Sequence, residues 1–206
     1  MSRITDQTKR FIRRVATFRN CCSRIEEQFA ANRLRTTDVE LVYASSFLSV
    51  CAQWEGLLEA VIYEVGCGEG SRKRGNARAV TFKKRSHLEQ LLLFPSKDYL
   101  GISTVKQAES LTRILVPSGM PVATIDEPSR TLLQQAGWIR NAIAHESDHA
   151  LQLFRKKVPG VEQLHSNKRY PAPFLRHEFR QSPIQRRLDV YFAAFQKSAE
   201  DMGRAW

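Results

Sequence analysis

The sequence predicts an all-α protein, an antiparallel bundle of four to five helices with a basic loop and a proline-rich connection before the last helix. Two observations favour this fold. Apolar residues recur at spacings of three and four in several long segments, as on one face of a helix. No segment shows the convincing polar–apolar alternation of a half-buried strand. Helices joined in this way by loops are typical of a bundle, and residues 1–206 are expected to form a single domain.

The first helix is predicted over residues 5–31. Two interleaved sets of residues, each with a spacing of seven, form a narrow apolar seam along it. The sets are Ile4, Phe11, Phe18 and Ile25, and Thr8, Val15, Cys22 and Phe29. The other faces carry basic residues from Lys9 to Arg24, which either are solvated or flank bound RNA.

A second helix is predicted to begin at Thr37, because Thr37 and Glu40 have the spacing of a capping box. It ends in the glycine-rich segment 66–70. Its predicted apolar stripe consists of Leu41, Ala44, Leu48, Cys51, Trp54, Leu58, Val61 and Val65.

Residues 66–85 are predicted to be an irregular basic loop. Its glycines do not form a nucleotide-binding loop, because no strand precedes them and no Gly-Lys-Ser/Thr follows. The loop either attracts phosphates or is a solvated linker. Its candidate RNA-binding residues are Arg72, Lys73, Arg74, Lys83, Lys84 and Arg85.

The second half of the chain predicts further helices. Short helices are expected at 86–94 and 104–115, and a longer one opens near Ser129 and runs to at least Ala144. Residues 158–183 contain several prolines and are predicted to be irregular. Ser182 and Pro183 form a helix start. The last helix then has an apolar face of Ile184, Leu188, Tyr191, Phe195, Ala199 and Met202.

Composition limits the classes of function. The net charge of +11 and the isoelectric point near 9.9 favour a polyanionic partner such as RNA. No stretch reaches the roughly 18 apolar residues of a membrane helix, and no apolar signal segment follows Met1. A soluble, cytoplasmic protein is therefore expected. None of the four cysteines forms a Cys-x-x-Cys pair, so they are expected to be buried, reduced thiols.

The segment from Trp138 to His145 carries the candidate chemistry. On a helix, Leu132, Ala136, Ile139 and Ile143 cluster on the side that faces the core. Trp138, Asn141 and His145 fall on nearly the opposite side, three and four residues apart. Arg140 lies on the flank, and its long side chain can swing toward His145.

These residue types suit phosphodiester cleavage. Histidine can move protons near neutral pH, and the planar guanidinium of arginine matches a phosphate whose charge builds in the transition state. The amide of Asn141 can position either group. Because Trp138 lies opposite the core stripe, it indicates a second burial surface such as a subunit interface.

The pattern Arg140-Asn141-x-x-x-His145 on the last long helix before the C-terminal one resembles the signature of HEPN domains. The upstream segments Ser45–Leu48 and Gln53–Glu59 are similar to the aromatic-Glu helix of several HEPN families. The resemblance implies a metal-independent endoribonuclease that uses no cofactor. Arg140 and His145 would be its catalytic pair, Asn141 would orient them, and Glu55 would support them.

The resemblance also implies partners and products. HEPN enzymes usually place two such motifs across a homodimer interface, and many are toxins or antiphage effectors. Attack by the ribose 2′-hydroxyl would leave a 2′,3′-cyclic phosphate. A tyrosine follows two residues after the histidine in HEPN toxins that a nucleotidyltransferase antitoxin silences, but this chain has Ser147 there. Another antitoxin or defence partner is still expected.

Two alternatives stay open at this point. His145-Glu146-Ser147-Asp148-His149 matches His-Glu-x-x-His, in which two histidines one helical turn apart bind zinc in metalloproteases. Asp148 inside the motif and the lack of a strand-rich subdomain disfavour it. The other alternative is a non-catalytic HEPN-like module that dimerises or binds RNA or nucleotides.

Overall fold

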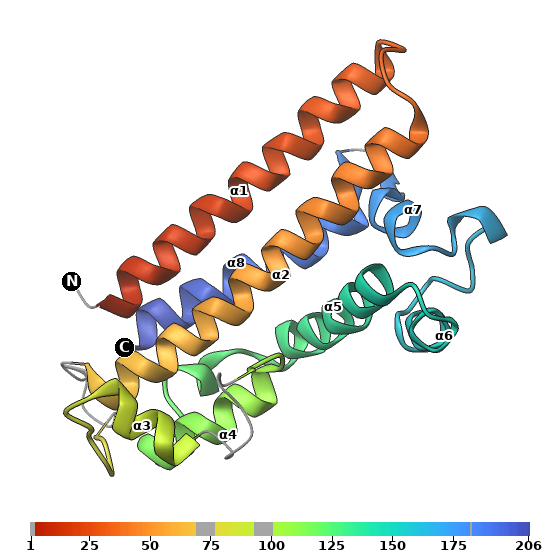
Figure 1. Ribbon diagram of the computed structural model, residues 1–206. Coiled ribbons are helices and arrows are strands. Elements are labelled where there is room, and N and C mark those ends of the chain that lie inside the picture. Colours follow the sequence, from red (N-terminus) through yellow and green to blue (C-terminus); the bar gives the residue numbers. More distant parts are fainter. Residues whose placement is uncertain (1–2, 69–76, 93–100, 182) are drawn as a thin grey trace. The chain divides into compact units, whose positions relative to one another are not determined.

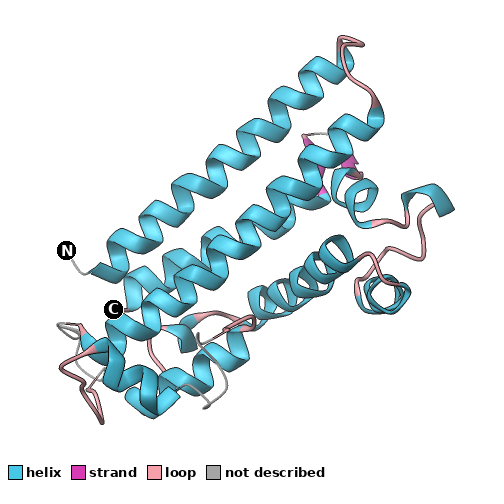
Figure 2. Ribbon diagram, viewed as in Figure 1, coloured by secondary structure: helices cyan, strands magenta, loops and turns pink. Residues whose placement is uncertain are grey.

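The computed structural model describes residues 3–68, 77–92, 101–181 and 183–206, and most of these are helical (Figures 1 and 2). The predicted all-α bundle is confirmed. The described elements, in chain order, are α1 (Arg3–Ala30), α2 (Thr36–Cys67), α3 (Arg85–Leu92), α4 (Val105–Leu115), the 3₁₀ turn η1 (Val122–Thr124), α5 (Glu127–His145), α6 (Asp148–Lys157), η2 (Ser166–Lys168), α7 (Pro171–Arg176), β1 (Glu178–Gln181), β2 (Ile184–Arg186) and α8 (Arg187–Ala205).

The chain divides into two compact units. Unit 1 comprises Met1–Ile12, Gln53–Arg130 and Gln196–Trp206, and unit 2 comprises Arg13–Ala52 and Thr131–Phe195. Helices α1, α2, α5 and α8 each contribute residues to both units. The single domain expected over residues 1–206 stays a prediction.

Unit 1 packs the start of α1 and the end of α2 against the end of α8 and the short helices α3 and α4. The ring of Phe11 lies 5.6 Å from that of Trp54. Thr5 donates a hydrogen bond to the Gly203 carbonyl oxygen at 3.3 Å. Gly66 allows α2 to approach Leu88, because a Cβ atom at this position would lie 2.5 Å from a Leu88 methyl group.

Unit 2 has its core between α1, α2, α5 and α8. The ring of Phe47 meets that of Tyr191 edge to face at 6.0 Å, and the Tyr191 hydroxyl donates to the Gln135 side-chain oxygen at 3.2 Å. Edge-to-face pairs of this kind stabilise a core beyond the area that they bury. Phe154 of α6 packs in the same way on Phe174 of α7, at 5.5 Å.

A half-buried ion pair ties α7 and the β-hairpin to α1 in unit 2. Arg176 donates two hydrogen bonds to the Glu26 carboxylate, at 2.8 and 3.1 Å, and its guanidinium lies over the Phe29 ring. Arg186 lies 3.7 Å from Glu26 and pairs with Glu178 at 2.7 Å. A bidentate arginine–carboxylate pair fixes the relative orientation of the two side chains as well as the distance between them.

The sequence missed the β-hairpin. Glu178–Gln181 and Ile184–Arg186 form two short antiparallel strands with an irregular register, shown in magenta in Figure 2. The last helix begins at Arg187, later than predicted, and Ser182 of the predicted helix start lies outside the described residues. Ile184 therefore lies in β2 and is 59% exposed, so its predicted place on the last helix was wrong. The 158–183 connection is also more regular than predicted, since it contains η2, α7 and β1.

Helix α2 departs from its predicted start and stripe. It begins at Thr36, and Asp38 accepts a hydrogen bond from the Arg35 backbone N–H at 2.9 Å, so the capping contact lies two residues before the predicted one. Leu41 is 67% exposed, and the first half of α2 instead buries Val39, Tyr43, Phe47 and Val50. From Cys51 onward the predicted stripe is buried.

The cysteines partly follow expectation. All four are free; Cys22 and Cys51 are buried, Cys67 is half-buried and Cys21 is exposed, against the prediction. Burial raises the pKa of Cys22 to about 11, which keeps this thiol protonated at neutral pH.

The Glu26 pair predicts a pH-dependent contribution to stability. Burial alone would raise the pKa of Glu26, but hydrogen bonds from Arg176 and Tyr43 lower it below the ordinary value. A carboxylate with a lowered folded-state pKa stabilises the fold above its unfolded-state pKa and loses that effect as the pH falls through the folded-state pKa. Glu26→Gln should therefore lower the free energy of unfolding by about 2 kcal/mol at pH 7, and by much less near pH 2.

Chemical denaturation at both pH values measures this difference. Glu27→Gln is the matched control, since Glu27 is the exposed neighbour on α1. An equal loss for Glu26→Gln at both pH values would contradict the assignment.

Candidate active site at the end of helix α5

Helix α5 is capped at its start by Asp126. The Asp126 carboxylate accepts a hydrogen bond from the Ser129 backbone N–H at 2.9 Å and pairs with Lys197 at 2.7 Å. The hydrogen bond from Lys197, followed by those from Ser129, holds the pKa of Asp126 well below its usual range. The carboxylate thus stays charged at the positive end of the helix, where it is favourable.

The buried face of α5 is close to the predicted one. Ala136 and Ile139 are buried as expected, joined by Leu133 and Ala142, while Leu132 and Ile143 of the predicted stripe are half-buried. The core face is therefore rotated slightly around the helix.

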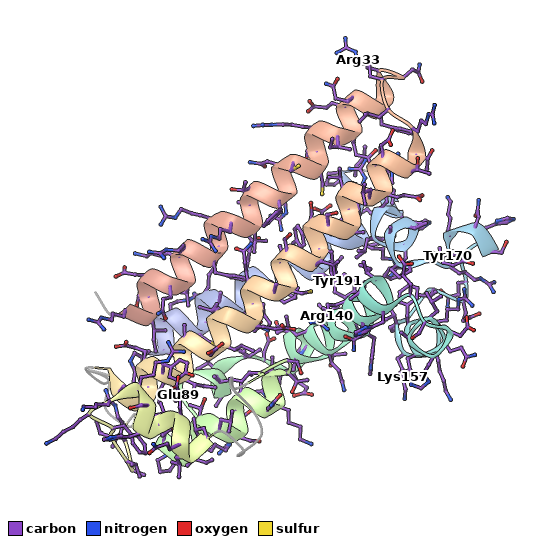
Figure 3. All side chains as sticks on the ribbon, viewed as in Figure 1. Arg33, Glu89, Arg140, Lys157, Tyr170 and Tyr191 are labelled. Carbon is purple, nitrogen blue, oxygen red and sulfur yellow. The ribbon has the colours of Figure 1, made fainter. Side chains whose placement is uncertain are left out.

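The motif residues lie away from this core face. Asn141 and His145 are exposed, and Arg140 is half-buried on α5, as Figure 3 shows for Arg140. The Arg140 guanidinium donates a hydrogen bond to the Asn141 side-chain oxygen at 3.0 Å. His145 makes no hydrogen bond or ion pair with any residue that the structure describes. The structure thus joins Arg140 to Asn141 and places His145 one turn further on, at the last residue of α5.

The helix stops at His145 because the next residue leaves the helical region. Glu146 has a φ of 48°, in the left-handed region. Ser147 then caps α6, its hydroxyl accepting a hydrogen bond from the Ala150 N–H at 3.3 Å. Left-handed residues directly after a helix are a common way to end it, though usually with glycine or asparagine.

This break removes the geometry of the zinc-protease alternative. His145 ends α5 and His149 lies in α6, so the two histidines are not one turn apart on a single helix, as zinc binding by His-Glu-x-x-His requires. Over the described ranges, no group of three or more His, Cys, Asp or Glu side chains could hold a metal ion.

Two supporting residues stay predictions. Glu55 is half-buried on α2 and belongs to unit 1, whereas Arg140, Asn141 and His145 belong to unit 2. Trp138 is half-buried on α5, and its role in a dimer interface is a prediction.

The basic loop is shorter than predicted, and Arg85 is not part of it. Arg85 is the first residue of α3, where it pairs with Glu89 at 2.9 Å and Glu59 at 3.3 Å and lies 3.5 Å above the Tyr63 ring. Hydrogen bonds from Tyr63 and then Arg85 lower the pKa of Glu89. Because two carboxylates already face its guanidinium, Arg85 is a poor candidate for binding phosphate.

The other loop residues divide in two groups. Lys83 and Lys84 are exposed and remain candidates for RNA contact. Arg72, Lys73 and Arg74 lie outside the described residues.

Two exposed aromatic side chains of unit 2, Tyr170 and Phe179, are not among the functional residues that the sequence predicts. Each has an arginine guanidinium over its ring. The sequence signal that could have pointed to them is the neighbouring positive charge, since Tyr170 follows two basic residues and Phe179 precedes one.

Comparisons with known proteins find no similar protein. No family model matches the chain, and searches of curated proteins and of solved structures find no match. The resemblance to HEPN domains therefore rests on the residues of the motif and its helix. Among the described helices, none is long and apolar enough to cross a membrane.

The left-handed residue predicts an unusual response to glycine. At most positions, glycine destabilises by about 0.5–1 kcal/mol through the entropy of the unfolded chain. A left-handed non-glycine residue costs a similar 1–2 kcal/mol, which glycine removes. Glu146→Gly should therefore leave the free energy of unfolding unchanged or raise it by up to about 1 kcal/mol.

Gln163→Gly is the control, since Gln163 is an exposed turn residue whose φ is not positive. It should lower the free energy of unfolding in the same denaturation assay. An equal loss in both variants would show that Glu146 is not left-handed.

Proposed function

We propose that this protein is a metal-independent endoribonuclease of the HEPN type, with Arg140 and His145 as its catalytic residues and Asn141 as the residue that positions Arg140. The observation that supports the proposal most is the arrangement at the end of α5. There the guanidinium is held by the neighbouring amide, and the imidazole is exposed with no hydrogen-bond partner among the described residues.

Each side chain has a role in attack by the ribose 2′-hydroxyl. The 2′-oxygen loses its proton and bonds to phosphorus, the bond to the 5′-oxygen breaks, and that oxygen takes up a proton. His145 is suited to one of these proton transfers. The Arg140 guanidinium stabilises the charge that builds on the phosphate oxygens. The products are a 2′,3′-cyclic phosphate and a 5′-hydroxyl.

Positive charge is needed at this position for a physical reason. The last carbonyl groups of a helix carry partial negative charge, which repels a phosphate. The Arg140 guanidinium and the overall charge of +11 supply the opposing attraction. Asn141 limits the freedom of the guanidinium and so lowers the entropy lost when RNA binds.

The biological setting is proposed by resemblance. The protein would act as a homodimer whose two motifs complete one site, with Trp138 at the interface. Its role would be that of a toxin or defence effector in the cytoplasm, restrained or triggered by a partner protein.

Cleavage should not need a metal and should need His145. Purified protein should cut RNA in the presence of EDTA, and His145→Ala should lower the rate about 10²- to 10⁴-fold, the usual contribution of a general acid or base. His149→Ala is the matched control, because His149 is also exposed but lies on α6. Gel analysis of labelled RNA measures both rates.

Other results of the same assay would favour the zinc-dependent or the non-catalytic alternative. Activity that disappears in chelator and returns with zinc would contradict metal-independent cleavage. RNA binding without turnover, the same for the parent and His145→Ala, would leave a non-catalytic binding module.

The shape of the guanidinium should matter as well as its charge. Arg140→Lys keeps the charge but loses the planar fork that pairs with Asn141 and phosphate. We therefore expect Arg140→Lys to lower the cleavage rate at least tenfold, nearly as much as Arg140→Ala, at saturating RNA. A fully active lysine variant would show that Arg140 contributes only to general attraction.

A further inference from the structure

Two exposed aromatic rings of unit 2 are each covered on one side by an arginine. Tyr170 is 49% exposed and Phe179 is 44% exposed. The Arg155 guanidinium lies 5.3 Å from the centre of the Tyr170 ring. The Arg187 guanidinium lies 5.2 Å from Phe179 and 5.3 Å from Phe174. Arginine over a ring is a known cation–π pair, and an exposed aromatic ring beside a cation can accept a stacked base.

Packing and backbone contacts hold the two arginines in place. Arg155 donates to the Arg169 carbonyl oxygen at 3.4 Å. Arg187 lies against Gly160, where a Cβ atom would be 2.7 Å from a guanidinium nitrogen, and Gly160 also has a φ of 83°. No carboxylate of the described chain forms an ion pair with either arginine.

The rings are presented by one packed substructure. Phe154, next to Arg155 on α6, packs on Phe174, which in turn contacts Arg187. Tyr170 immediately precedes α7, and Phe179 follows it in β1.

This part of the chain has a strong surplus of positive charge. Residues 148–187 contain nine lysines and arginines against three acidic residues, so a polyanion is favoured over a neutral partner. Four of the basic side chains are exposed and have no ion pair within the described residues: Lys156, Lys157, Lys168 and Arg180. The pKa of His177 is lowered by burial and then by the nearby charges of Lys168 and Arg187.

We propose that this region binds single-stranded RNA, with unpaired bases stacking on Tyr170 and Phe179 and phosphates pairing with the surrounding cations. We call Tyr170, Phe179, Arg155 and Arg187 the stacking surface. This inference names the kind of RNA that the proposed endoribonuclease binds, and it rests on that proposed function. The four residues of the stacking surface lie outside the Arg140–His145 motif. Aromatic rings beside cations suit single strands, because duplex RNA offers no free base faces. An acidic protein would need the charges but not the rings.

The test measures binding of a fluorescent 12-nucleotide oligoadenylate by anisotropy, in a His145→Ala background so that the RNA stays intact. Tyr170→Ala and Phe179→Ala should each weaken binding about tenfold, as removal of a stacked ring does. Tyr170→Phe should bind like the parent. Leu41→Ala removes an exposed apolar side chain of the same unit and should have no effect.

The salt dependence of RNA binding distinguishes the contribution of the aromatic rings from that of the cationic side chains. Lys156→Gln and Lys168→Gln should each reduce the slope of log affinity against log salt by about 0.7, the value for one contact to a single-stranded phosphate. The ring variants should weaken binding at every salt concentration and leave this slope unchanged. A duplex of the same length should bind more weakly and should not respond to the ring variants.

Leucine variants keep the proposal testable if the alanine variants fail to fold. Tyr170→Leu and Phe179→Leu keep apolar packing but lose the aromatic face, so they should bind weakly while melting near the parent temperature. Parent-like RNA binding by both ring variants would overturn the inference. The inference would also be overturned if polyglutamate displaced the RNA equally well from the parent protein and from the ring variants.

The two proposals can fail separately. If protein with an intact His145 does not cut RNA, yet binding depends on Tyr170 and Phe179, only the endoribonuclease proposal fails. If it cuts RNA while the ring variants bind normally, only the stacking surface fails.

Discussion

The left-handed backbone at Glu146 is the constraint on which the candidate site depends. It ends α5 at His145, so the imidazole lies at a helix terminus, while Asn141 and Arg140 lie about one turn earlier on the helix. On an uninterrupted helix His149 would lie beside His145, and the two would form a metal-binding pair. One backbone angle therefore removes the zinc-binding geometry that the spacing of the two histidines suggests.

Electrostatics divides the basic residues into two kinds. Some already face carboxylates: Arg85 faces Glu59 and Glu89, and Arg176 faces Glu26. Their charges hold local structure together and are largely compensated. Others, such as Lys156 and Lys168, are exposed without such partners among the described residues, and these can attract a polyanion. Net charge alone does not distinguish the kinds.

Where one face of a segment alone is apolar, the sequence predicted the structure well. The seam of α1, the face of α8 after Leu188 and the outward position of Asn141 and His145 follow from spacing. Helix α2 has apolar residues on every side, so spacing did not reveal that Leu41 faces water. The β-hairpin was missed because the contact of Arg186 with Glu26, which is distant in sequence, stabilises it along with the local pair of Arg186 and Glu178. Likewise, the role of Arg85 depends on carboxylates of two helices.

In the proposed reaction, the end of α5 directs the 2′-hydroxyl of RNA against the adjacent phosphate. Mass spectrometry of the fragments made from a defined RNA oligonucleotide tests it most directly. We expect fragments ending in a 2′,3′-cyclic phosphate paired with fragments beginning in a 5′-hydroxyl, and no cut at a position where the ribose lacks its 2′-hydroxyl. Fragments with a 3′-hydroxyl and a 5′-phosphate, or cleavage at the 2′-deoxy position, would contradict it.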